Sequence, residues 1–94
     1  MTTVRNVVIL GSTGSIGVST LDVIARHPSR FKVLAVTAHR QIDRLYEQIV
    51  AFRPQYAVVV DAQAAKQLEA RLREAGMRTA VLSGEKSLEE VAAH

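Results

Sequence analysis

Residues 7 to 17 read Val-Val-Ile-Leu-Gly-Ser-Thr-Gly-Ser-Ile-Gly, a short apolar run that breaks into three glycines spaced three residues apart. The run Val7–Leu10 is typical of a strand buried on both faces, and a helix is expected to start at or near Ser15. That helix would direct its unpaired N–H groups and the positive end of its dipole at the space above the loop. The stretch therefore predicts a strand, a dinucleotide phosphate loop and a helix.

Each glycine of this loop has its own predicted role. Gly11 allows a sharp turn out of the strand, Gly14 lets backbone approach a pyrophosphate, and Gly17 allows close packing of the helix against the sheet. The N–H groups from Thr13 to Ile16 and the hydroxyls of Ser12, Thr13 and Ser15 are the predicted phosphate donors. The spacing is G-x-x-G-x-x-G rather than G-x-G-x-x-G, so the alternative is a tight glycine turn with only a packing role.

The rest of the chain alternates apolar runs with segments of helical periodicity. Further strands are predicted at residues 31–38, 56–60 and 79–82, with helices between them that end at Pro28, at Pro54 and before Gly76. Strands joined by helices run parallel with right-handed crossovers, which predicts an open α/β sheet with helices on both faces. The expected fold class is α/β, a doubly wound parallel sheet of the Rossmann-like type.

The predicted helix ends carry recognisable residues. Asp61 is the expected N-cap of the third helix, and Gly76 its left-handed C-terminal residue. Glu69 and Arg73 have the i,i+4 spacing of an ion pair on that helix. Ser87 and Glu90 have capping-box spacing before a fourth, short helix. A dinucleotide-binding domain uses two βαβαβ halves, so we interpret residues 1–94 as its N-terminal part, with a complete small domain as the alternative.

The second predicted strand is followed by His39, Arg40 and Gln41, with no acidic residue. NAD enzymes usually place Asp or Glu there to bind the ribose 2′-OH. Arg40 offers a planar guanidinium that suits a 2′-phosphate, which favours NADP over NAD. The alternative is that Arg40 is an ordinary solvated surface charge.

Composition argues against several other classes of protein. The 94 residues carry a net charge of +3. They include no cysteine, which excludes a thiolate nucleophile and a cysteine metal site. The arginines are dispersed and only four residues are aromatic, so no nucleic-acid partner is expected. The sequence shows no secretory signal and no apolar stretch near the ~20 residues that span a bilayer, so a cytoplasmic protein without a membrane partner is expected.

The sequence closely resembles the start of the 1-deoxy-D-xylulose 5-phosphate reductoisomerase family. The resemblance rests on residues 9–17, 19–23, 27–28 and 31, and on the later stretches 52–58 and 81–84. It implies an NADPH-dependent oxidoreductase that rearranges a phosphorylated ketose and reduces the resulting aldehyde to 2-C-methyl-D-erythritol 4-phosphate, in the non-mevalonate route to isoprenoid precursors. It also implies a divalent metal, magnesium or manganese, and a cytoplasmic homodimer.

The same resemblance carries cofactor contacts onto seven positions: Thr13, Gly14, Ser15, Ile16, His39, Arg40 and Gln41. The last three replace the family's usual Gly-Lys-Asn, and arginine for lysine keeps the charge. The family's metal ligands and substrate-phosphate residues lie beyond residue 94, so no catalytic or metal-binding residue is assigned, and the segment alone is expected to be inactive. Two alternatives stay open: an NADP-dependent dehydrogenase of the semialdehyde type, and a non-catalytic NADP-sensing module.

Overall fold

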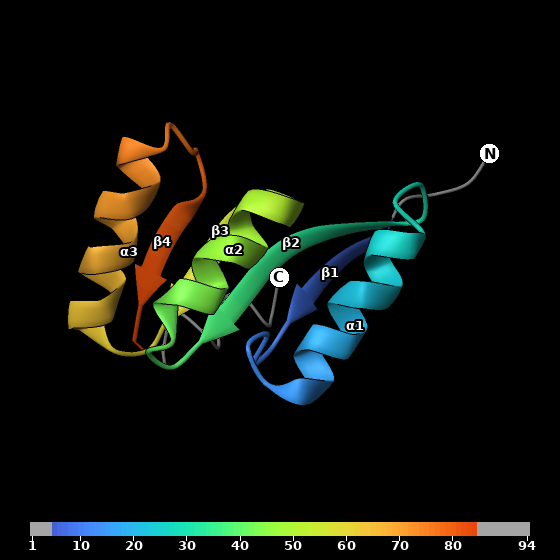
Figure 1. The fold of residues 1–94 in the computed structure, drawn as a ribbon, viewed down its shortest axis with the longest axis horizontal. Helices are drawn as coiled ribbons and strands as arrows, with labels where there is room; N and C mark the ends of the chain where they lie inside the picture. The colour runs from blue at the N-terminus through green and yellow to red at the C-terminus, as the bar shows by residue number, and fades with distance from the viewer. Residues whose placement is uncertain (1–4, 85–94) are drawn as a thin grey trace.

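A computed structural model of the chain describes residues 5–84 as a parallel sheet with helices packed on it (Figure 1). The strands are β1 (Arg5–Ile9), β2 (Phe31–Ala38), β3 (Tyr56–Val59) and β4 (Ala80–Ser83). The helices are α1 (Ser15–Arg26), α2 (Ile42–Phe52) and α3 (Ala62–Glu74). Every pair of neighbouring strands is parallel, in the order β1-β2-β3-β4. The predicted α/β class and the parallel pairing are confirmed, whereas the capping box at residues 87–90 lies outside the described residues.

The first strand differs from the prediction in its position and in its burial. It runs over Arg5–Ile9 rather than Val7–Leu10, and Leu10 is 57% exposed in the turn that follows. Within the strand, only Ile9 is buried, while Val7 and Val8 are half-buried. The expectation of burial on both faces is wrong for β1 because, among residues 5–84, it lies at the edge of the sheet with β2 as its only neighbour.

All three helices pack on one face of the sheet. Leucine and isoleucine side chains from each helix join one core cluster with residues of β1, β2 and β3: Ile9, Leu21, Ile24, Val33, Val36, Leu45, Ile49, Ala57, Val59, Leu68 and Leu72. The expectation of helices on both faces is wrong for the described part of the chain. Each helix connects one strand to the next strand in the sheet, always in the same direction across the sheet. Because such connections are right-handed, all the helices lie on the same face.

The pairing of β1 with β2 contains an irregularity that sets the position of the loop. Val7 pairs with Val33 but Val8 pairs with Ala35, so Leu34 is an extra residue in β2. The register then continues to the pair Ile9–Val36. Thr37 therefore lies one step beyond the last pair, beside the point where the chain leaves β1.

The ends of α3 form as predicted. The Asp61 carboxylate accepts hydrogen bonds from the N–H groups of Gln63 (2.9 Å) and Ala64 (3.2 Å), so it is the N-cap. Gly76 follows the helix with a φ of 71°, a conformation that favours glycine. Arg73 donates to Glu69 at 2.9 Å, the expected i,i+4 pair, although both side chains are exposed and the pair contributes little.

Replacing the N-cap of α3 tests how much this helix depends on it. We expect Asp61→Ala to lower the free energy of unfolding by about 1 kcal/mol, because two N–H groups lose their acceptor. Asp61→Asn keeps an acceptor oxygen and is expected to retain most of the stability. Urea unfolding of the chain measures both variants, and equal losses in the two would contradict a cap that acts through hydrogen bonding.

Candidate dinucleotide-binding site

The loop after β1 and the segment after β2 lie side by side, because β1 and β2 are parallel and their carboxyl ends are on the same side of the sheet. Thr37 joins them. Its Oγ1 accepts a hydrogen bond from the N–H of Gly11 at 2.7 Å, and its carbonyl accepts from the N–H of Ser12 at 2.9 Å and from the Ser12 hydroxyl at 3.2 Å. The prediction that the Ser12 hydroxyl is a phosphate donor is wrong, because this hydroxyl is fully buried and donates to Thr37. Since Thr37 precedes His39 by two residues, these bonds place both predicted groups of cofactor contacts side by side.

The loop presents backbone donors that the described part of the protein does not use. Helix α1 begins at Ser15 with Gly14 as its N-cap, and no side chain caps it. The N–H of Gly14 donates to the Gly11 carbonyl at 3.0 Å, and the N–H of Val18 makes the first helical bond. Over residues 5–84, the N–H groups of Thr13, Ser15 and Ile16 have no acceptor. Free N–H groups at a helix start are a binding site for an anion.

Two of the three loop glycines are required by the backbone itself. Gly11 has a φ of 65°, which fits its predicted role in the sharp turn. A Cβ on Gly17 would lie 2.5 Å from the Gly11 carbonyl oxygen and 2.6 Å from the Ser12 Cα. The close contact of Gly17 is therefore with the loop backbone, more than with the sheet as the sequence suggested.

Gly14 differs from the other two loop glycines. A Cβ there would meet only the Gly11 carbonyl oxygen, at an ordinary 3.4 Å, and its φ of −77° suits any residue. The folded chain itself therefore does not require a glycine at this position. A ligand that approaches the exposed backbone closely does supply a reason, and a pyrophosphate is such a ligand.

The segment after β2 has a fixed backbone and exposed side chains. The His39 carbonyl accepts from the N–H of Asp61 at 2.9 Å, and the Arg40 carbonyl accepts from the N–H of Ile42 at 3.0 Å. His39, Arg40 and Gln41 are all exposed, and Gln41 is the N-cap residue of α2 without a side-chain cap bond. No ion pair involves the Arg40 guanidinium within the described residues. It is thus available to an anionic group beside the loop.

Two residues that shape the loop were not predicted from the sequence. Thr37 is a polar residue, 3% exposed, near the end of an otherwise apolar strand. Gln48 lies on α2 and donates from Nε2 to the Ser12 carbonyl at 2.7 Å. Only Thr37 gave a sequence signal, as a polar residue between Val36 and Ala38 in an apolar strand, whereas Gln48 follows the polar Glu47 and gave none.

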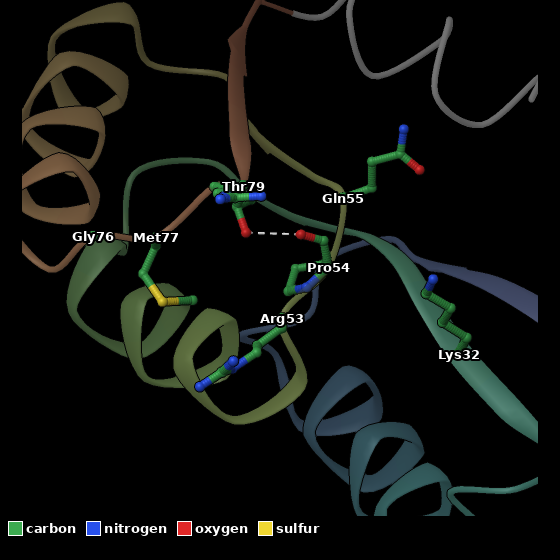
Figure 2. Close-up of a pocket in the computed structure, with 8 residues that line it drawn as sticks. Lys32, Arg53, Pro54, Gln55, Gly76, Met77 and Thr79 are labelled. Atoms are coloured by element: carbon green, nitrogen blue, oxygen red, sulfur yellow. Dashed lines mark hydrogen bonds between the residues drawn. The ribbon is translucent and has the colours of Figure 1, made fainter.

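A pocket of about 500 Å³ lies at the opposite end of the strands, near their first residues (Figure 2). Lys32, Arg53 and Arg78 line it, and Thr79 Oγ1 donates to the Pro54 carbonyl at 2.7 Å across it. In Figure 2 the Arg53 guanidinium points away from the Lys32 ammonium group, so these two cations do not converge on one anion. The pocket also lies away from the loop, and we do not assign it to the cofactor.

Residues 5–84 contain neither a cluster of metal-binding side chains nor a helix that could span a membrane. No group of three His, Cys, Asp or Glu side chains could hold a metal ion in this part of the chain. None of its helices has the length and apolar character that crossing a bilayer requires.

The profile of the 1-deoxy-D-xylulose 5-phosphate reductoisomerase family matches residues 7–94. The chain belongs to this family. The reductoisomerase of Nitrosomonas europaea is 60% identical over 92 residues, which are 98% of this chain and 22% of that protein. That of Burkholderia multivorans is 59% identical over 87 residues, 93% of this chain and 22% of the relative. The chain thus spans about a fifth of the length of these curated relatives.

Solved reductoisomerase structures share the fold. One from Zymomonas mobilis in complex with NADPH has a TM-score of 0.88 and 37% identity, over 96% of this chain and 23% of that one. Another, in complex with magnesium, has a TM-score of 0.90 and 37% identity, over 96% of this chain and 22% of that one. The family resemblance and the Rossmann-like, NADP-binding fold class predicted from the sequence are confirmed. The seven predicted contact residues stay predictions.

The glycines of the loop allow a test that separates packing from ligand approach. We expect Gly17→Ala to lower the free energy of unfolding by about 1–3 kcal/mol, since its Cβ would collide with the loop backbone. Gly14→Ala meets only an ordinary contact and is expected to lose less than about 1 kcal/mol, mostly as a poorer N-cap. Urea titrations of the two variants give the comparison, and a larger loss in Gly14→Ala would contradict the packing described above.

Proposed function

We propose that this chain supplies the phosphate-binding part of the NADPH site in a 1-deoxy-D-xylulose 5-phosphate reductoisomerase. Residues 1–94 are then the N-terminal part of the dinucleotide-binding domain, and the catalytic and C-terminal domains belong to the remainder of the complete protein. The observation that carries the proposal is the set of unpartnered N–H groups at Thr13, Ser15 and Ile16 at the start of α1. They fit an anionic group, which the pyrophosphate of NADPH provides.

The segment after β2 supports NADPH over NADH. The backbone around Arg40 is held by hydrogen bonds from the N–H of Ile42 to the Arg40 carbonyl and from the N–H of Asp61 to the His39 carbonyl. The Arg40 guanidinium is exposed and has no acidic partner in the described residues. A guanidinium can bind the ribose 2′-phosphate through two parallel hydrogen bonds. His39 and Gln41 flank it with exposed side chains, and both belong to the proposed contact set with Gly14 and Arg40.

The proposed activity of the complete protein follows from the family. Bound NADPH would supply hydride to an aldehyde formed by rearrangement of 1-deoxy-D-xylulose 5-phosphate, a step in isoprenoid-precursor synthesis. A divalent metal, magnesium or manganese, would hold the substrate oxygens and polarise the carbonyl, and its ligands would lie outside this chain. We further propose that the complete protein is a cytoplasmic homodimer that binds neither nucleic acid nor membranes. Family membership favours this function over a semialdehyde-type dehydrogenase or a cofactor-sensing module.

Reversing the charge at Arg40 tests the cofactor preference. The protein for the assay is a complete reductoisomerase in which residues 1–94 replace the matching segment of the Nitrosomonas europaea relative. We expect Arg40→Glu to raise the KM for NADPH by about tenfold or more, because a charged hydrogen bond is lost and a like charge faces the 2′-phosphate. The KM for NADH is expected to stay the same or to fall, since NADH lacks that phosphate.

Arg44→Glu is the matched control, because it makes the same charge change at an exposed position inside α2. It is expected to alter the two KM values much less than Arg40→Glu does. Steady-state kinetics with both cofactors give the ratios. Equal losses for NADPH and NADH in Arg40→Glu, or equal effects of the two substitutions, would refute the assignment of Arg40 to the 2′-phosphate.

A further inference from the structure

We propose that Gln48 is a positioning residue of the cofactor site, which orients the Thr13 N–H toward the pyrophosphate without touching the ligand. The inference rests on the proposed function and extends it to a residue outside the loop. It starts from one hydrogen bond, in which Gln48 Nε2 donates to the Ser12 carbonyl at 2.7 Å across 36 positions of sequence.

Every polar group of Ser12 makes a hydrogen bond. It is fully buried, its N–H and its hydroxyl both donate to the Thr37 carbonyl, and its own carbonyl accepts from Gln48. The N–H and the hydroxyl are thus fixed by β2, and the carbonyl is fixed by α2. Gln48 is the one described residue that holds the carbonyl end of Ser12.

The direction of the Ser12 carbonyl determines the direction of the next N–H. The peptide unit between Ser12 and Thr13 is planar and trans, so its C=O and N–H point in opposite directions. When Gln48 draws the carbonyl toward α2, the Thr13 N–H is turned away from α2. That N–H has no acceptor within residues 5–84, which is the state required of a donor to a ligand.

The Gln48 side chain is itself well anchored and has a defined orientation. Its neighbours along α2, Leu45 and Ile49, are fully buried against the sheet, so the helix cannot shift easily at this point. The amide must present Nε2 to the Ser12 carbonyl, because the flipped orientation would set two oxygens against each other. Helix α2 also begins directly after Arg40 and Gln41, so Gln48 ties the loop to the element that follows the proposed 2′-phosphate segment.

The two polar atoms of the Gln48 amide differ in their contacts. Nε2 donates to the Ser12 carbonyl, whereas Oε1 is buried and accepts no hydrogen bond from residues 5–84. An apolar side chain at position 48 would remove that unsatisfied oxygen but would leave the Ser12 carbonyl without its donor.

The experiment compares Gln48→Met with Gln67→Met in the grafted reductoisomerase described above. Gln67 is an exposed glutamine on α3 and provides the matched control. We expect Gln48→Met to raise the KM values for NADPH and for NADH by the same factor, about tenfold, because the pyrophosphate is common to both cofactors. At saturating cofactor, kcat is expected to stay within about twofold, since binding rather than chemistry is affected.

Gln48→Glu tests the chemistry of the contact at constant shape. Its carboxylate would repel the Ser12 carbonyl, so we expect a larger rise in both KM values than in Gln48→Met. Unchanged KM values in a folded Gln48→Met protein, or a fall in kcat with KM unchanged, would overturn the positioning role. A parent protein that fails to prefer NADPH over NADH would instead overturn the proposed function, so the two failures are distinguishable.

A measurement without substitution applies even if the variants do not fold. The backbone amide of Thr13 is followed by ¹⁵N NMR in the grafted protein as NADPH or NADH is added. We expect a large shift of this resonance at saturation with either cofactor, because its N–H gains a charged acceptor. A Thr13 resonance that stays in place when the neighbouring loop resonances move would refute the inference.

Discussion

The hydrogen bonds of Ser12 are the constraint on which the loop depends. Ser12 is fully buried where β1 ends, and a buried polar residue must find partners or destabilise the fold. It finds them on β2 through the Thr37 carbonyl and on α2 through Gln48. With Ser12 fixed in this way, the chain turns at Gly11 and packs against Gly17, and the N–H groups of Thr13, Ser15 and Ile16 have no acceptor within residues 5–84. The exposed part of the loop is therefore held by the buried residues Ser12 and Thr37 and the half-buried Gln48.

The regular elements could be predicted from the sequence because their signals are local. The apolar run of β2, the spacing of Leu45 and Ile49 on α2, and the carboxylate of Asp61 each act within a few residues of chain. The glycines of the loop were predictable for the same reason, since a positive φ at Gly11 is a property of one residue. The family resemblance added the identity of the ligand, which local patterns alone do not determine.

The features that escaped prediction all depend on contacts between distant residues. Gln48 and Ser12 are 36 positions apart, and Thr37 and Gly11 are 26 apart, so neither pair has a local signature. The extra residue Leu34 in β2 determines which side chain of β2 lies beside the loop. The register of two strands cannot be predicted from the apolar run of one of them. The common face of the three helices follows from the order of the strands, which periodicity does not report.

The strand order also bears on how this segment is made. Each described strand after β1 pairs with the strand that precedes it along the chain, so within residues 5–84 no pairing has to wait for a later strand. These strands can therefore assemble in chain order during synthesis, one βα unit at a time, with little loop-closure entropy at each step. Thr37 and Gln48, which hold the loop, emerge from the ribosome before β3 and α3 do. The loop after β1 can thus take up its structure before the second half of the described sheet forms.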